Sequence, residues 1–319
     1  MTDGGSRISG VWMEPGRYVW HNGRLVAWED ATVHVASHSL HYGSSVFEGI
    51  RAYATPRGPA VFCLEPHVER LLDSCRIFRM AVPYSKEALR QAILEVVRAN
   101  GQEDCYIRPL VYRGAGSFSL DPRKSPVEVA ILTLRWGTYL GSEALERGVD
   151  VAVSSWRRMA PSTHPAMGKI AGNYVNSQLA TMEAGDGGYA EALMLDVHGY
   201  VSEGSGENLF LVRDGVLYTP PLWQSILPGV TRRVALTLAR ELGYEVREVP
   251  IPREMLYVAD EVFLTGTAAE ITPVRSVDRV VIGEGRPGPV TRRIQQAFFA
   301  VVRGEAPDRH GWLTYVEGA

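Results

Sequence analysis

A lysine lies in unusual surroundings in the segment MGKIAGNYVNSQ (167–178). Lys169 is flanked by glycine, alanine, isoleucine and methionine, and no carboxylate follows it at helical spacing. Most lysines are solvated surface charges. A lysine that loses its hydration instead favours the neutral, nucleophilic form, which can form a Schiff base with the carbonyl group of a substrate or cofactor. The spacing alone leaves both interpretations open.

A glutamate occupies a second informative segment, VSEGSGENLFLV (201–212). Glu203 ends a β-prone run, and Gly204 and Gly206 would let the backbone pass close to a flat group. By itself this pattern favours a tight turn with an exposed carboxylate. A carboxylate that faces a heteroaromatic nitrogen would keep that ring protonated, so that the ring could accept electrons from a carbanion.

Two further segments have the pattern of anion-binding sites. LPGVTRR (227–233) places small and hydroxyl-bearing residues at the start of an amphipathic helix, where free N–H groups and the helix dipole favour phosphate. TGTAAE (265–270) repeats such a pattern after a predicted strand. Each signal is weak alone. Together with Lys169 and Glu203, they predict a cofactor site with a lysine, an acid and a phosphate-binding end.

A competing set of residues is the histidine-rich segment HVASHSLHYG (34–43). His34, His38 and His41 have spacings that metal sites use on helices. However, no carboxylate lies near them, and the segment leads into an extended run. We therefore predict no metal ligand here. A metallohydrolase that uses these histidines and a non-catalytic binding protein remain the alternatives from other functional classes.

Hydrophobic spacing predicts the elements that must position these residues. Asn22-Gly23 within 18–26 is typical of a β-hairpin turn. Helices are expected at about 64–78, 86–99, 173–185, 231–242 and 290–303. Strands are expected at about 45–53, 105–112, 127–134, 149–156 and 261–266, with a β-meander through ALMLDV, GYVSEG, NLFLV and GVLYT. The whole is an α+β fold in two parts, with an N-terminal domain at 1–134, a linker at 135–147 and a C-terminal domain at 148–319.

Composition narrows the class of protein. The 319 residues are 45% hydrophobic and 22% charged, which is ordinary for a globular protein. The net charge of −3, without a long basic run, argues against nucleic acid or an anionic membrane as a partner. No stretch has membrane-spanning length or the form of a signal peptide. The three cysteines show no metal or disulfide pattern. We therefore expect a cytoplasmic protein.

A set of motifs in this order resembles one family. The motifs are HSLHYGSSVFEGIR, YIRPL, WGTYLG, GKIAGNYVNS, GYVSEGSGENLF, LPGVTR and TGTAAEITPVRSVD. They resemble the branched-chain amino-acid aminotransferases, from about residue 18 to the C-terminus. That family depends on pyridoxal 5'-phosphate and has fold type IV. The resemblance implies a small N-terminal α/β domain and a larger C-terminal domain with a β-barrel-like core.

The resemblance also implies site residues. Lys169 would be the catalytic residue that binds the cofactor covalently, and Glu203 would face the pyridine nitrogen. The cofactor-binding set would be Arg70, Lys169, Tyr174, Glu203, Leu227, Gly229, Val230, Thr231 and Thr267. The substrate-binding set would be Phe47, Gly49, Tyr106, Arg108, Trp136, Tyr139, Thr267, Ala268 and, from a neighbouring subunit, Tyr42. Without the resemblance, Arg70 would pass as a solvated helix charge, because acidic residues adjoin it.

For Arg108, the strand pattern and the family resemblance imply different partners. Alternation along CYIRPLVY (105–112) puts apolar residues on one face and Arg108 among tyrosines on the other. An arginine in such a setting needs an anion, and pairing with a nearby acid would satisfy it. By resemblance, this arginine meets the distal carboxylate of glutamate.

The implied activity is transamination of leucine, isoleucine or valine with 2-oxoglutarate by a ping-pong mechanism, with amino acids and 2-oxo acids as ligands. A homodimer or a higher homo-oligomer, including a hexamer, is expected. The nearest alternative is another fold type IV enzyme: a D-amino-acid or (R)-amine transaminase, or aminodeoxychorismate lyase. The loop GAGSFSLDPRKSP (114–126) departs from the family pattern.

Overall fold

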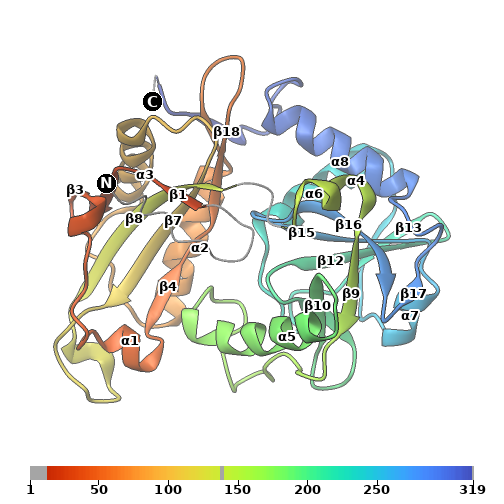
Figure 1. Cartoon of the computed structure of the whole chain (residues 1–319), viewed down its shortest axis with the longest axis horizontal. Helices are drawn as coiled ribbons and strands as arrows, with labels where there is room; N and C mark the ends of the chain where they lie inside the picture. The colour runs from red at the N-terminus through yellow and green to blue at the C-terminus, as the bar shows by residue number, and fades with distance from the viewer. Residues whose placement is uncertain (1–12, 137–139, 318–319) are drawn as a thin grey trace. The chain divides into compact units, whose positions relative to one another are not determined.

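Residues 13–136 and 140–317 are described by a computed structural model with an α+β fold (Figure 1). Contacts between residues divide the chain into two units. The first unit comprises Met1–Tyr139, Gly168–Gly172 and Val301–Ala319, and the second comprises Leu140–Met167 and Asn173–Ala300. Two segments from far along the chain therefore pack with the N-terminal part, and one of them carries Lys169.

The first unit is built on an antiparallel sheet of nine described strands, in the order β18-β6-β5-β7-β8-β2-β3, with β1 paired to β8 and β4 to β7. The strands are β1 (Met13–Pro15), β2 (Tyr18–His21), β3 (Arg24–Ala27), β4 (Ser45–Phe47), β5 (Ile50–Tyr53), β6 (Ala60–Phe62), β7 (Cys105–Arg113), β8 (Val127–Trp136) and β18 (Leu313–Tyr315). Helices α2 (Leu64–Ile77) and α3 (Lys86–Asn100) bury their apolar faces in this unit's core. The predicted hairpin is confirmed, with positive φ angles at Asn22 and Gly23.

The run predicted as one strand at 45–53 is divided into β4 and β5 by its partner. Phe47 pairs with Leu110 and Ile50 with Ile107, so the register continues without a shift. Between them the Glu48 N–H donates to the carbonyl of Pro109 at 2.9 Å. Because proline has no N–H to return, the ladder is interrupted at this point.

The second unit contains a nine-stranded sheet of described strands, in the order β11-β10-β9-β16-β15-β12-β13-β14, with β17 paired to β16. The strands are β9 (Val149–Val153), β10 (Glu191–Leu195), β11 (Val201–Gly204), β12 (Asn208–Arg213), β13 (Val216–Thr219), β14 (Val246–Glu248), β15 (Glu261–Gly266), β16 (Glu270–Val277) and β17 (Val280–Val281). Edge strand β11 leads through a short turn into β12 in the middle of the sheet, so the sheet curls into a barrel-like core. The helices are α4 (Ser142–Arg147), α5 (Tyr174–Asp186), α6 (Val230–Glu241), α7 (Arg253–Tyr257) and α8 (Pro289–Val302).

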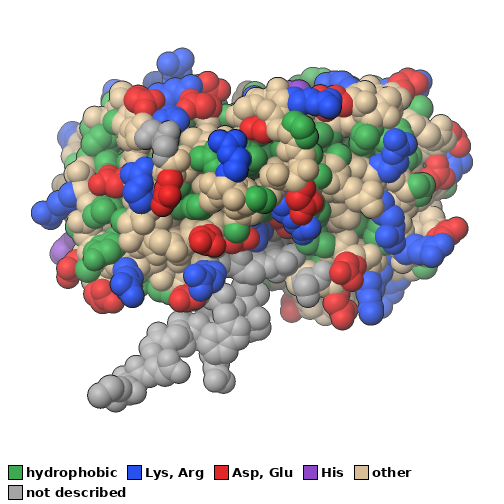
Figure 2. Space-filling model, turned by 90° about the horizontal axis from the view of Figure 1, so that it is seen from above, with side chains coloured by type: hydrophobic (Ala, Val, Ile, Leu, Met, Phe, Trp, Pro, Cys, Tyr) green, Lys and Arg blue, Asp and Glu red, His purple; other side chains and the backbone are tan. Residues whose placement is uncertain are grey.

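The five predicted helices correspond to α2, α3, α5, α6 and α8, each within one residue at either end. Strand β9 is shorter than predicted and ends at Val153. Within the described part of the chain, none of the helices combines the length and apolar character needed to cross a membrane. On the face shown in Figure 2, basic and acidic side chains are interspersed, so this face presents no continuous basic stripe.

Candidate active site

The segment that carries Lys169 is fixed against β4 and α2 of the first unit. The Lys169 carbonyl accepts a hydrogen bond from the Phe47 N–H at 3.1 Å, and Ile170 forms a β-bridge with Val46. The Lys169 N–H donates to the Ser74 hydroxyl of α2 at 2.9 Å. These contacts place the half-buried side chain with Nζ 4.8 Å from the centre of the Phe47 ring.

Lys169 differs from the other lysines of the chain. The sequence has three, and Lys86 forms ion pairs with Glu65 and Glu69 at 2.9 and 2.7 Å on the surface of α2 and α3. Lys124 is exposed. Only Lys169 has its ammonium group against an aromatic ring of β4, among the described residues. The Phe47 ring adds an apolar neighbour from β4 to the apolar residues that flank Lys169 in the sequence.

Four residues predicted to bind substrate lie together: Phe47 on β4, Gly49 between β4 and β5, and Tyr106 and Arg108 on β7. The Arg108 guanidinium lies 4.6 Å from the Phe47 ring centre, and its Nη2 donates to the Tyr106 hydroxyl at 2.9 Å. At Gly49 a Cβ atom would overlap that hydroxyl, so only glycine fits beside it. Arg108 Nε is buried and has no hydrogen-bond partner in the described part of the chain. A buried donor without a partner is costly, which favours an incoming anion.

Arg70 is not a solvated helix charge. Its Nε and Nη2 donate to the two carboxylate oxygens of Glu48 at 2.7 and 2.8 Å. Glu48 is fully buried, and His67 contacts the same carboxylate through Nδ1 at 2.8 Å. Sequence analysis missed Glu48 and His67 entirely. The only signal was a glutamate at an alternating position whose neighbours on that face are Val46 and Ile50.

In the second unit, Glu203 lies on β11 and is 5% exposed. Its Oε1 pairs with Arg158 Nη2 at 2.7 Å. Its Oε2 accepts hydrogen bonds from Asn208 Nδ2 at 3.1 Å and from the Leu227 N–H at 2.9 Å. The turn with an exposed glutamate, which the local pattern favoured, is therefore wrong. The donors favour the carboxylate anion and fix its plane.

The predicted phosphate-binding segments have different local forms. Helix α6 begins at Val230 after Gly229, with Thr231 next, and no side chain of the described residues caps its first turn. A Cβ at Gly229 would overlap the Asn208 side chain, so this turn needs glycine. The first-turn N–H groups of a 12-residue helix are suited to bind an anion. Thr267 and Ala268 lie in the turn between β15 and β16.

The remaining predicted residues are placed as follows. Tyr174 is the first residue of α5, and Trp136 is the last residue of β8. Tyr139 lies outside the described residues. Tyr42 ends the short helix α1 (His38–Tyr42) and is 45% exposed, and its hydroxyl donates to the Phe118 carbonyl at 3.1 Å.

The three histidines of the competing metal hypothesis bind protein groups instead. His38 contacts the Ser44 hydroxyl at 2.6 Å and the Ser119 carbonyl at 2.9 Å through its two ring nitrogens. His41 Nε2 contacts a backbone carbonyl, and His34 Nδ1 accepts from a backbone N–H. Across the described ranges, no group of three His, Cys, Asp or Glu side chains is arranged to hold a metal ion.

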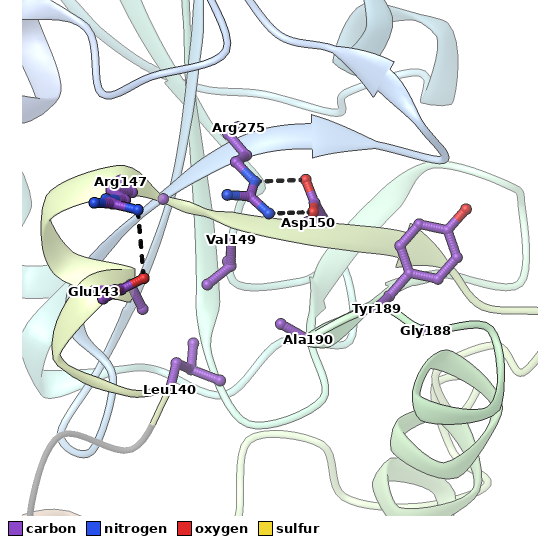
Figure 3. A pocket seen from close by; sticks show the side chains of 11 residues that line it. Leu140, Glu143, Arg147, Val149, Asp150, Gly188, Tyr189, Ala190 and Arg275 are labelled. Carbon is purple, nitrogen blue, oxygen red and sulfur yellow. Dashed lines mark hydrogen bonds and ion pairs between the residues drawn. The ribbon is translucent and has the colours of Figure 1, made fainter.

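A pocket of about 390 Å³ lies in the second unit beside α4, β9 and β16 (Figure 3). Its walls carry the Arg275–Asp150 pair, at 2.6 Å, and the Arg147–Glu143 pair, at 3.6 Å. Each of these charges already has an oppositely charged partner. None of the predicted site residues lines this pocket, so it is not part of the candidate site.

Comparisons with known proteins agree with the motifs. The family described as amino-transferase class IV matches residues 45–277. A branched-chain-amino-acid aminotransferase of Escherichia coli (strain K12) is 55% identical over 300 residues, covering 94% of this chain and 97% of that protein. The crystal structure of an Escherichia coli branched-chain amino acid aminotransferase has a TM-score of 0.93 at 54% identity, covering 94% of this chain and 99% of that one.

A second solved structure adds ligands. The branched-chain amino acid aminotransferase of T.th., complexed with N-(5'-phosphopyridoxyl)-L-glutamate, has a TM-score of 0.90 at 48% identity, covering 94% of this chain and 99% of that chain. The same protein complexed with 4-methylvaleric acid gives the same values. The family match and the sequence identities over nearly the whole chain together show the family. This chain belongs to the class IV aminotransferases of fold type IV, and within them to the branched-chain-amino-acid aminotransferases.

Proposed function

We propose that this protein transfers the amino group of leucine, isoleucine or valine to 2-oxoglutarate in two half-reactions of a ping-pong mechanism. One observation carries the proposal. Lys169 lies against Phe47, on the face where Arg108 has a buried donor without a partner among the described residues. A nucleophilic amine, an apolar surface and a cation for a second carboxylate are what a dual-substrate aminotransferase requires.

The cofactor is pyridoxal 5'-phosphate. Three features of the described chain fit its three reactive ends. Lys169 suits the aldehyde, the uncapped first turn of α6 suits the phosphate, and the Glu203 carboxylate suits the pyridine nitrogen. When bound, this group supplies an electron sink for the carbanion that forms at the Cα of the amino acid.

The chain itself supplies the proton transfers. Lys169 Nζ would hold the cofactor covalently and, once released by the substrate amine, would be the base that moves the proton from the substrate Cα. Arg158 and Asn208 orient Glu203, whose carboxylate would accept a hydrogen bond from the pyridine N–H and stabilise that proton. The reverse sequence with the second substrate regenerates the starting form.

The other predicted residues bind and orient. Arg70 and the first turn of α6 would hold the phosphate, Tyr174 the ring hydroxyl, and Leu227 one ring face. The turn that contains Thr267 and Ala268 would contribute to both the phosphate and the substrate carboxylate sites.

The substrate pocket would take an apolar side chain and a carboxylate in turn. The branched side chain would rest on Phe47 and on the aliphatic stem of Arg108, and the distal carboxylate of glutamate would meet the guanidinium. The T.th. relative supports this dual use, because it has been solved both with a glutamate conjugate and with a branched six-carbon acid.

The decisive experiment joins cofactor mapping to half-reaction kinetics. Borohydride reduction of the holoenzyme, followed by peptide mass spectrometry, should place the cofactor mass on Lys169. Because the chain has three lysines, Lys86→Ala and Lys124→Ala are complete controls, and both variants should react with leucine at the parent rate. Lys169→Ala should fold and should lack the visible band and the transamination. Full turnover by Lys169→Ala would refute the mechanism, and a preference for D-alanine or an (R)-amine would favour the alternative fold type IV enzymes.

We further propose that the protein is a homodimer or a higher homo-oligomer. The first unit exposes apolar side chains on α1 and on the loop at 114–126: Leu40 at 61%, Phe118 at 60% and Leu120 at 81%. His41 packs edge-on against Phe118 at 5.1 Å, so helix and loop form one surface. A contiguous apolar surface of this kind is typical of a subunit interface, and it includes Tyr42, the residue expected to act in the neighbouring subunit.

The oligomeric state provides the test. Sedimentation of the parent should give at least a dimer, and replacement of Phe118 and Leu120 by aspartate should shift it toward the monomer and reduce turnover. The matched control is aspartate at Val281, an exposed valine of the second unit, which should leave the sedimentation unchanged. A parent that sediments as a monomer would contradict the proposal.

Cytoplasm is the proposed compartment. The three cysteines are free and buried, which is compatible with a reducing environment. Fractionation of expressing cells would test this, and recovery from a secreted fraction would contradict it.

A further inference from the structure

Glu48 is a carboxylate in an apolar face. Alternation along β4 and β5 puts it on the same side as Val46 and Ile50, and all three residues are fully buried. That side faces the core formed with α2, where Val68 and Leu71 are also buried. The register with β7 and the position of α2 therefore place an ionisable group where an aliphatic side chain would pack.

The carboxylate of Glu48 is bound on both oxygens. Arg70 forms a two-pronged pair with it through Nε and Nη2. His67 Nδ1 lies 2.8 Å from Oε2, and the Gly49 N–H donates to the same oxygen at 3.2 Å. Burial would raise the pKa of Glu48, but the charge and hydrogen bonds of Arg70, together with the hydrogen bond from His67, hold it well below its usual range. Burial lowers the pKa of His67, so its neutral ring donates from Nδ1 to the anion.

Stability does not explain this arrangement well. A buried ion pair gains little over apolar residues of similar volume, because desolvation of both charges offsets their attraction. What the arrangement does provide is geometry. A two-pronged carboxylate fixes the plane of a guanidinium, and His67 fixes the carboxylate in turn. The contact with Ser74 attaches the Lys169 segment to the same helix.

We propose that Glu48, oriented by His67, is a positioning residue that fixes the Arg70 guanidinium for the phosphate of the cofactor. This inference rests on the proposed phosphate role of Arg70 and extends it to two residues that do not touch the cofactor. An arginine already held in place loses less conformational entropy when an anion binds, so the phosphate is bound more tightly.

The readout must separate phosphate binding from general damage. Pyridoxal lacks the phosphate but keeps the aldehyde and the ring. The readout is the dissociation constant of pyridoxal divided by that of pyridoxal 5'-phosphate. Both are measured on apoprotein whose folded state has been verified by circular dichroism. This ratio therefore reports the phosphate site alone. Three variants are compared with the parent: Glu48→Gln, Arg70→Lys and the double variant that carries both substitutions. The matched control is Glu65→Gln on α2, the helix that also carries Arg70; Glu65 pairs with Lys86 and Arg90, and all three side chains are partly exposed.

Glu48→Gln should lower this ratio by roughly tenfold or more, as loss of a charge-assisted hydrogen bond implies, with pyridoxal affinity nearly unchanged. Arg70→Lys should lower it as well, and the double variant should be no worse than Arg70→Lys, because both act through one group. Glu65→Gln should match the parent. A parent-like ratio in folded Glu48→Gln, with a lowered ratio in Arg70→Lys, would overturn the positioning role alone. A parent-like ratio in Arg70→Lys would overturn the phosphate role of Arg70, and the inference with it.

A second variant covers the case in which Glu48→Gln does not fold. His67→Gln keeps a side-chain donor and removes the ring that orients the carboxylate. It should lower the ratio by a smaller factor, roughly threefold, since one neutral hydrogen bond is misaligned. An unchanged ratio in folded His67→Gln would reject the role of His67 and, without a folded Glu48 variant, the proposal as a whole.

Discussion

The two units each contain a buried glutamate–arginine pair, and the pairs differ in which partner is held. In the first unit, Arg70 binds Glu48 through two nitrogens, and the exposed fractions of the side chains are 11% and 0%. In the second unit, Arg158 binds Glu203 through Nη2, and both side chains are 6% exposed. The second oxygen of Glu203 is bound by Asn208 and a backbone N–H.

The difference shows that the same two residue types can serve opposite purposes. In the first pair the carboxylate completes its bonds inside the core, and the arginine is the group proposed to bind the phosphate. In the second pair the arginine supports the carboxylate, which is the group proposed to face the pyridine nitrogen. The residue types alone do not distinguish the two pairs, whereas the groups that bind each carboxylate do: Arg70 and His67 for Glu48, and Arg158 and Asn208 for Glu203.

The largest expected effect is a loss of stability when the arginine of either pair is replaced. Arg70→Leu and Arg158→Leu each leave a buried carboxylate without its cation, so each should lower the free energy of unfolding of the apoprotein by about 3–5 kcal/mol. Arg275→Leu is the control, because its pair with Asp150 is 44% and 36% exposed and should contribute less than about 1 kcal/mol. Urea denaturation measures all three. Equal losses in the three variants would show that burial does not set the cost.

Glu203→Gln should separate the two pairs by function. A neutral amide cannot stabilise the protonated pyridine, so the leucine half-reaction should lose about 2.7–4 kcal/mol of transition-state stabilisation, while affinity for the cofactor is largely kept. Glu48→Gln should show the opposite pattern. Single-turnover kinetics and cofactor titration measure the two quantities. A rate within a factor of two of the parent in Glu203→Gln would contradict the distinction.

A third arginine, Arg108, sharpens the comparison, because no carboxylate of the described residues forms an ion pair with it. Arg108 donates to the Tyr106 hydroxyl, and its Nε has no partner in the described residues. Arg108→Leu should weaken the glutamate half-reaction relative to the leucine one by about 1.5–3 kcal/mol, the value of a charge-assisted hydrogen bond. The ratio of the two half-reaction rate constants measures this effect. An unchanged ratio would mean that Arg108 is structural.

The smallest effect is the pH dependence of stability that His67 and Glu48 contribute. The folded pKa of His67 is below its ordinary 6.5 and that of Glu48 below its ordinary 4.5, so the unfolded chain takes up both protons first. Stability should therefore fall as the pH drops below about 6.5, and fall further below about 4.5, by at most about 1.4 kcal/mol per pH unit for each group. His67→Gln should remove the first part. Denaturation between pH 7 and 5 checks this, and the same slope in His67→Gln would count against it.

The helices and strands around the site could be predicted because their information is local. The spacing of apolar residues in α2, the Asn22-Gly23 turn and the alternation along β7 each depend on neighbours a few positions away. The same alternation correctly separated Arg108 from the apolar face. The interruption between β4 and β5 could not be seen in 45–53, since it arises from a proline on another strand.

The missed site residues depend on contacts between distant segments. Arg70 adjoins Glu69 and Asp73 in sequence, which indicates a solvated charge, and its actual partner comes from β4. Arg158 and Glu203 are separated by 45 positions, and the fold of the second unit brings them together. Spacing cannot report such pairs. The resemblance supplied Arg70, but it carried no information on Glu48, His67 or Arg158.

The scarcity of lysine has a practical consequence for protein chemistry. Amine-directed reagents can modify only the α-amino terminus and three side chains, and Lys86 is bound between two carboxylates. In the apoprotein, Lys124 and Lys169 are thus the principal side-chain targets, and occupation of the cofactor site would shield the second. Labelling the loaded protein first, and the emptied protein afterwards with a different reagent, would place a single probe at Lys169 without any engineered residue. The same chain would be a poor substrate for amine-coupled immobilisation, because few attachment points lie outside the site.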